Sequence, residues 1–116
     1  MALSPHNNGV DYVEFAAPDF APIKVFYGNA FGWTFTDYGP DYLAFDDARL
    51  AGGFRKGDPA SGSTLVVLYA DNLEASEKSV RDAGGEITAE IFSFPGGRRF
   101  QFKDPAGNDL AVWSDK

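Results

Sequence analysis

The chain has 116 residues and a mass of 12.6 kDa, which is the size of one ordinary domain. Hydrophobic residues make up 44% of it and aromatic residues 16%, so the composition is that of a folded protein and excludes a disordered one. The net charge of −7 argues against a nucleic-acid partner, and the absence of cysteine excludes disulfides, thiolate catalysis and cysteine-ligated metals.

Membrane and secretion signals are also missing. No apolar run approaches the roughly 20 residues that a membrane span needs, and residues 1–9 lack the basic start and apolar stretch of a secretion signal. We therefore expect a cytoplasmic protein without a membrane partner. Residues 1–9 are predicted to form a loosely held tail.

The first half of the chain begins with a predicted strand, Val10 to Ala16, which is followed by Asp19. An amphipathic helix is predicted from about Phe20 to Phe31. Gly32 ends this helix, because glycine readily takes the left-handed conformation that closes a last turn. Turn residues then separate three short segments that are typical of strands, namely Trp33–Tyr38, Asp41–Asp46 and Leu50–Arg55.

The second half repeats this order of elements. A predicted strand, Thr64 to Ala70, precedes Asp71, and a helix is predicted from Leu73 to Ala83, with Gly84 after it. Each aspartate is expected to cap its helix by accepting from first-turn amides, and each stands 13 residues before the closing glycine. Three predicted strands follow, Glu86–Phe94, Arg98–Lys103 and Asp109–Ser114.

The repeat predicts an α+β fold of two βαβββ modules, residues 10–56 and residues 64–116. Residues 57–63 have almost no apolar content and are predicted to link the two modules. A module of about 50 residues buries too little surface to be stable by itself. We therefore expect both modules to pack into a single domain.

Three segments also resemble a known family. They are the strand Val10–Phe15 leading to Asp19, the stretch FYGNAFGW at residues 26–33, and the stretch DPAGNDLAVW at residues 104–113. The last two are similar to the first helix with its glycine turn and to the last hairpin of the vicinal oxygen chelate superfamily, which includes glyoxalase I, bleomycin-resistance proteins and extradiol dioxygenases. The resemblance implies the glyoxalase/bleomycin-resistance fold, in which each module's curled mixed sheet helps to form a cup, and it implies a homodimer.

The resemblance also gives positions for a metal site. Metal-dependent members hold a divalent cation with His and Glu ligands on the first and last strands of each module. The matching positions here are Tyr12, Thr64 or Leu65, and Ala111, while residues 50–54 contain no ligand-type side chain. A divalent metal needs at least three imidazole or carboxylate donors, and the only histidine, His6, falls in the predicted tail. We therefore predict no bound metal and no cofactor.

The predicted lining of the cup follows from side-chain alternation. Tyr12 and Glu14 share one face of their strand, and they face the cup if Val13 and Phe15 pack on the helix. Glu14 is a candidate general base, with an exposed strand charge or an interface salt bridge as alternatives. The predicted ligand-binding residues are Tyr12, Glu14, Trp33, Leu65, Val67, Phe100 and Trp113.

Two further predictions carry alternatives. Trp33 belongs to an aromatic cluster that fits a core at the junction of helix and sheet, and contact with a ligand is the alternative. One of Arg98 and Arg99 is expected to alternate inward; solvation at the surface is the preferred interpretation for both, and contact with an anionic group is the alternative.

Three functions stay open. The leading prediction is a metal-free homodimer that binds a small aromatic or amphipathic molecule, as the resistance branch of the family does, and the acidity of the chain suits a cationic ligand. The second is an enzyme, either a lyase or isomerase with Glu14 as base or a metal enzyme with displaced ligands. The third is a module that chiefly mediates association.

Overall fold

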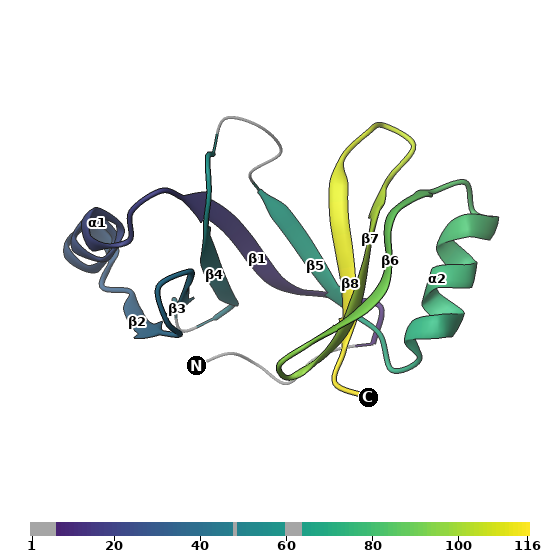
Figure 1. Cartoon of the computed structure of the whole chain (residues 1–116), viewed down its shortest axis with the longest axis horizontal. Coiled ribbons are helices and arrows are strands. Elements are labelled where there is room, and N and C mark those ends of the chain that lie inside the picture. The colour runs from purple at the N-terminus through teal and green to yellow at the C-terminus, as the bar shows by residue number, and fades with distance from the viewer. Residues whose placement is uncertain (1–6, 48, 60–63) are drawn as a thin grey trace. The chain divides into compact units, whose positions relative to one another are not determined.

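Figure 1 shows the computed structural model of the chain, which describes residues 7–47, 49–59 and 64–116. His6 and residues 60–63 of the predicted linker lie outside the described residues. The chain divides into two compact units, residues 12–65 in one and residues 66–116 with residues 7–11 in the other. In the described ranges, no helix combines the length and apolar character that crossing a membrane requires.

The described residues of the first module form one helix and four strands. The strand order in its sheet is β2-β3-β4-β1, with antiparallel pairing of β2 with β3 and of β3 with β4, and parallel pairing of β4 with β1. The elements are β1 (Val10–Ala17), α1 (Ala21–Phe31), β2 (Thr34–Asp37), β3 (Tyr42–Asp46) and β4 (Ala51–Lys56).

The second module has the same arrangement. Its strand order is β6-β7-β8-β5, with antiparallel pairing except between β8 and β5, which are parallel. The elements are β5 (Leu65–Tyr69), α2 (Leu73–Asp82), β6 (Glu86–Phe94), β7 (Gly97–Lys103) and β8 (Asp109–Ser114). The predicted repeat of two βαβββ modules is confirmed, and no predicted element shifts by more than one residue at either end.

The helix ends correct one detail of the sequence analysis. Asn72, rather than the predicted Asp71, caps α2, and its side-chain oxygen accepts from the Ala75 amide at 3.0 Å. At α1 the cap residue makes no side-chain hydrogen bond, although Asp19 accepts from the Ala21 amide at 3.3 Å. α2 begins at Leu73, as predicted, so the residue directly before it, Asn72, occupies the N-cap position and Asp71 stands one residue too early.

Each helix covers one face of its own module's sheet. In the first module the buried cluster consists of Ala17, Leu43, Phe45 and Phe54, against which side chains of α1 pack. In the second module the cluster consists of Ala70, Leu73, Phe100 and Val112. Burying a side chain such as Phe100 stabilises the fold by about 1.5–3 kcal/mol. The opposite face of each sheet, called here the helix-free face, faces away from the module's own helix.

The segment before β1 is bonded to β5. Asn8 N donates to Tyr69 O at 2.7 Å, and Tyr69 N donates to Gly9 O at 3.0 Å. The Asp71 amide donates to the side chain of Asn7 at 2.8 Å. Residues 7–9 therefore do not form the loosely held tail that their polar composition suggests, because their backbone groups satisfy the exposed groups of a strand.

Candidate functional site

The helix-free face of the first module carries Glu14 and Tyr42. Phe15 and Leu43 belong to the core under α1, so strand alternation places their neighbours Glu14 and Tyr42 on the opposite face. This is the orientation predicted for Tyr12 and Glu14. The Glu14 residue is only 5% exposed although it carries a carboxylate, and a buried charge requires hydrogen-bond partners.

A short chain of hydroxyl groups leads to that carboxylate. The Tyr42 hydroxyl donates to Glu14 Oε2 at 3.0 Å, and the Tyr12 and Tyr42 hydroxyl oxygens are 2.6 Å apart. An ionised carboxylate can only accept, so the Tyr42 proton points to Glu14 and the Tyr42 oxygen accepts the proton of Tyr12. The orientation of both hydroxyl groups therefore follows from the charge of Glu14.

The electrostatic surroundings keep Tyr42 protonated. Burial raises the pKa of Tyr42 far above its usual range, and the charge of Glu14 and the neighbouring Tyr12 raise it further. Arg55 reaches the same carboxylate from β4, with its Nε 3.9 Å from Glu14 Oε1. Glu14 is thus held between a neutral donor and a guanidinium on the helix-free face.

Sequence reasoning missed Tyr42 and Arg55. A signal for Tyr42 was present in the Gly52-Gly53 pair of β4, because two glycines in a strand interior mark a place where another group approaches closely. A β-carbon at Gly53 would overlap the hydroxyl and ring of Tyr42. Gly53 also lies beside Glu14 in the parallel register of β1 and β4. The missing side chain therefore makes room for the ring that binds Glu14.

The residues at the matched metal positions do not fit a divalent cation. The Tyr12 hydroxyl is bonded to Tyr42, Ala111 is fully buried without a donor atom, and Leu65 is aliphatic. Throughout residues 7–47, 49–59 and 64–116, no three His, Cys, Asp or Glu side chains come close enough together to hold a metal ion. The matched positions therefore lack the donors that a metal-dependent reaction needs.

The helix-free face of the second module is mainly aromatic. The Tyr69 and Trp113 rings meet edge to face with centroids 5.3 Å apart, and Phe94 lies 6.4 Å from Trp113. The guanidinium carbon of Arg99 lies 5.5 Å from the ring centroid of Phe92 and 6.0 Å from that of Phe94. Such contacts between a cation and ring faces are attractive.

The two arginines that follow the β6–β7 turn differ in direction, as alternation predicts. Arg98 forms a two-pronged ion pair with Glu74 of α2, with Nη1 to Oε2 at 2.5 Å and Nη2 to Oε1 at 3.2 Å. The Arg98 side chain is one-third exposed, so the surface interpretation holds for this residue. Arg99 is the inward one of the pair.

Two of the predicted cup residues lie on the helix side of their module. Trp33 stacks between Tyr27 of α1, at 4.6 Å, and Phe45, at 4.4 Å, and so belongs to the first core. Phe100 has no exposed surface and packs with Leu73 under α2. Placing these two residues in the cup was wrong. The flat ring of Trp33 completes an aromatic stack in the core, and the side chains of β7 alternate with the opposite phase from the one predicted, which turns Phe100 to the helix side.

The other predicted residues of the second module lie on its helix-free face. Val67 and Trp113 lie opposite the α2 core in the second module, since Leu68 and Val112 pack in that core. Leu65 shares the phase of Val67 and is also buried. The indole Nε1 of Trp113 donates to Asp11 Oδ2 at 2.8 Å, which fixes the ring on this face.

Comparison with known proteins now identifies the family. Residues 9–112 match the model of the Glyoxalase/Bleomycin resistance protein/Dioxygenase superfamily. The chain therefore belongs to this superfamily, as the resemblance of its motifs implied.

Individual relatives differ in length and in described activity. The chain is 32% identical, over an alignment of 126 residues, to the anthracycline biosynthesis protein DnrV of Streptomyces peucetius, covering 88% of this chain and 45% of DnrV. It thus spans slightly less than half of that relative.

Two solved structures share the fold at low sequence identity. The Mn(II)-bound glyoxalase from Novosphingobium aromaticivorans has a TM-score of 0.69 at 24% identity, with 94% of this chain and 39% of that chain covered. Methylmalonyl-CoA epimerase from Mycobacterium tuberculosis has a TM-score of 0.72 at 13% identity, with 98% and 92% covered. These likenesses show the fold and not the reaction, because one fold supports unrelated chemistries.

Proposed function

We propose that this protein binds a small aromatic, cationic molecule without a metal ion, as a sequestration or resistance protein does. The observation that carries the proposal is the Tyr12–Tyr42–Glu14 chain on the helix-free face of the first module. Tyr12 puts a phenol at one of the matched metal positions, and Tyr42 and Glu14 lie beside it. Ring faces attract an aromatic cation, and Glu14 fixes the direction of the two hydroxyl groups beside them.

The net charge of the chain and its similarity to a known protein support the same ligand class. A net charge of −7 raises the local concentration of cations near the protein. The relative DnrV is named for anthracycline biosynthesis. Anthracyclines are fused aromatic ring systems, and their glycosylated forms carry an amino sugar, so they combine both required features. An anthracycline is therefore a suitable probe.

An enzyme is the second candidate, with Glu14 as a general base in a lyase or isomerase. The observation in its favour is that Glu14 is a buried carboxylate on the helix-free face with a neutral donor, Tyr42, beside it. A base and a donor at one place are what proton transfer next to a carbonyl requires. The binding proposal has the advantage that Tyr42 and Arg55 both stabilise the ionised carboxylate.

Fluorescence titration of an anthracycline in the presence of a chelator tests the binding proposal. We expect saturable binding that Glu14→Gln weakens about tenfold, which corresponds to a loss of about 1.4 kcal/mol. Glu90→Gln is the matched control, because it makes the same change of charge on an exposed strand residue. Equal affinities of the two variants, or no saturable binding at all, contradict the proposal.

Mass spectrometry of the recovered ligand separates the two candidates. A binding protein returns the anthracycline unchanged after prolonged incubation. Conversion that depends on the protein and disappears in Glu14→Gln replaces the binding proposal with the enzyme.

A further inference from the structure

Arg99 stands in a row of aromatic side chains that crosses the sheet of the second module. In the antiparallel registers, Phe92 of β6 is paired with Arg99 of β7, and Arg99 is paired with Trp113 of β8. In the parallel register of β8 and β5, Trp113 is paired with Tyr69. Paired residues of neighbouring strands lie on the same face of a sheet. We call these four residues the Arg99 row; it places one cation among three rings.

The Arg99 row lies on the helix-free face of the second module. Phe100 and Val112, the neighbours of Arg99 and Trp113 along their strands, belong to the core under α2, so alternation turns the row the other way. Phe92 is 39% exposed, and Arg99 and Trp113 are partly exposed. A small molecule can therefore reach the guanidinium and the rings beside it.

The contacts of Arg99 suit it to bind an anion. Its guanidinium carbon lies 5.5 Å from the ring centroid of Phe92 and 6.0 Å from that of Phe94. A guanidinium that stacks on rings keeps its N–H groups in its own plane. It has five such donors in a rigid fork, which is enough to serve protein groups and a ligand at the same time.

The acidic groups that reach the rings of the Arg99 row are each bonded to a ring. Asp11 Oδ2 accepts from the indole of Trp113 at 2.8 Å, and Asp115 Oδ1 accepts from the hydroxyl of Tyr69 at 2.5 Å. A second cation, Lys116 Nζ, lies 5.7 Å from the ring centroid of Tyr69. The only charge within the row itself is therefore positive.

We propose that the Arg99 row binds a small aromatic carboxylate. The carboxylate accepts two hydrogen bonds from the guanidinium fork of Arg99, and the flat body of the ligand packs against the rings of Trp113 and Phe92. The net charge of −7 slows the approach of an anion, so recognition depends on these short-range contacts. The site goes beyond the proposed function, because it lies on the other module and takes a ligand of opposite charge.

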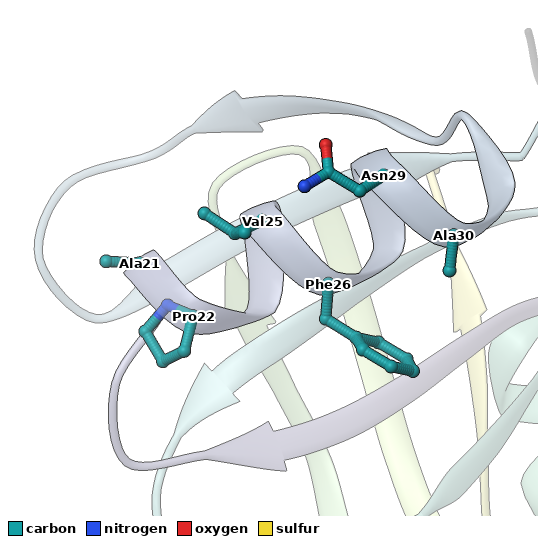
Figure 2. Close-up of a pocket in the computed structure, with 6 residues that line it drawn as sticks. All are labelled: Ala21, Pro22, Val25, Phe26, Asn29 and Ala30. Carbon is teal, nitrogen blue, oxygen red and sulfur yellow. The ribbon is translucent and has the colours of Figure 1, made fainter.

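An apolar depression on α1 is the competing place for an aromatic probe. Figure 2 shows the side chains that line it on the outward side of the helix, namely Ala21, Pro22, Val25, Phe26, Asn29 and Ala30. None of these six residues is charged. A surface of this kind takes up an aromatic acid and its uncharged amide equally well, whereas the Arg99 row discriminates between them.

Titration of the wild-type chain with naphthoate, followed by the indole N–H resonances, tests the proposal. The chain has two tryptophans, and Trp33 lies in the first module's core, so the two signals report on different modules. We expect the Trp113 signal to shift until it saturates and the Trp33 signal to stay in place. Naphthamide, which has the same rings without the charge, should bind about tenfold more weakly. Equal affinities of the two probes, or a shift of the Trp33 signal alone, overturn the proposal.

Two adjacent arginines provide a matched pair of variants. Arg99→Gln and Arg98→Gln remove the same charge, but Arg98 is paired with Glu74 of α2 instead of standing in the row. We expect Arg99→Gln to reduce the affinity for naphthoate about tenfold, to that for naphthamide, and Arg98→Gln to leave it unchanged. Circular dichroism checks that both variants are folded, and the comparison of the two probes on the wild type decides the question if Arg99→Gln is not. Equal affinities of the two folded variants contradict the proposal.

Discussion

Replacing Tyr42 with Phe tests the interpretation of the first helix-free face. The substitution keeps the ring and removes only the hydroxyl, which donates to Glu14 at 3.0 Å and lies 2.6 Å from the Tyr12 hydroxyl. Because Glu14 is 5% exposed, water does not readily replace the lost donor. The carboxylate is left buried with one donor fewer.

The expected loss follows from the kind of hydrogen bond. A bond to a charged group contributes about 1.5–3 kcal/mol, and a bond between neutral groups about 0.5–1.5 kcal/mol. Tyr42→Phe removes one of each, and Tyr12→Phe removes the neutral bond between the two hydroxyl groups. We expect a decrease of about 2–4 kcal/mol in the free energy of unfolding for Tyr42→Phe, and of about 1 kcal/mol for Tyr12→Phe.

Urea denaturation followed by circular dichroism, at one fixed protein concentration, measures both values. The double variant should cost little more than Tyr42→Phe alone, because Tyr42 takes part in both hydrogen bonds. If Tyr42→Phe is as stable as the wild type, or loses less free energy of unfolding than Tyr12→Phe, the proposed direction of the hydrogen bonds from Tyr12 through Tyr42 to Glu14 is refuted.

Three further predictions concern the hydrogen bonds that join Tyr12, Tyr42 and Glu14, and the first turn of α2. Gly53→Ala should displace the Tyr42 ring and reproduce the destabilisation of Tyr42→Phe, as chemical denaturation can show. The pKa of Tyr42 is raised above the unfolded value of about 10, so its contribution to stability is complete below that pH and decreases above it. The urea concentration at the unfolding midpoint should therefore decrease less above pH 10 in Tyr42→Phe than in the wild type. Asn72→Ala should cost about 1 kcal/mol in the free energy of unfolding, and a larger cost for Asp71→Ala would show that the cap is assigned to the wrong residue.

The fold could be predicted from the sequence because its signals are local and repeated. The glycines after each helix, the turns with proline, and the equal spacing of Asp19 with Gly32 and Asp71 with Gly84 each define an element boundary. The resemblance of the motifs then supplied the arrangement of the strands. Both predicted helix caps were one residue early. Phe20, and not Asp19, stands at the N-cap of α1, and Asn72 caps α2 in place of the adjacent Asp71, which is also able to cap a helix.

The candidate site was predicted only in part, because it depends on contacts between strands. Alternation was enough to place Tyr12 and Glu14 on one face, but it does not tell which residue of another strand approaches them. Tyr42 stands 28 residues from Glu14, and its approach depends on the missing side chain of Gly53. Trp33 was misplaced because an aromatic ring fits a core stack and a ligand site equally well by composition.

Calorimetric titration with Mn²⁺, Ni²⁺, Zn²⁺ and Mg²⁺, after elemental analysis of protein purified without chelator, tests the central claim that the site works without a metal. The account predicts no stoichiometric metal after dialysis and only weak surface binding, because Tyr12, Leu65 and Ala111 offer no set of converging donors. A stoichiometric site of micromolar affinity that Glu14→Gln abolishes would contradict it and place the protein among the metal-dependent members of its family.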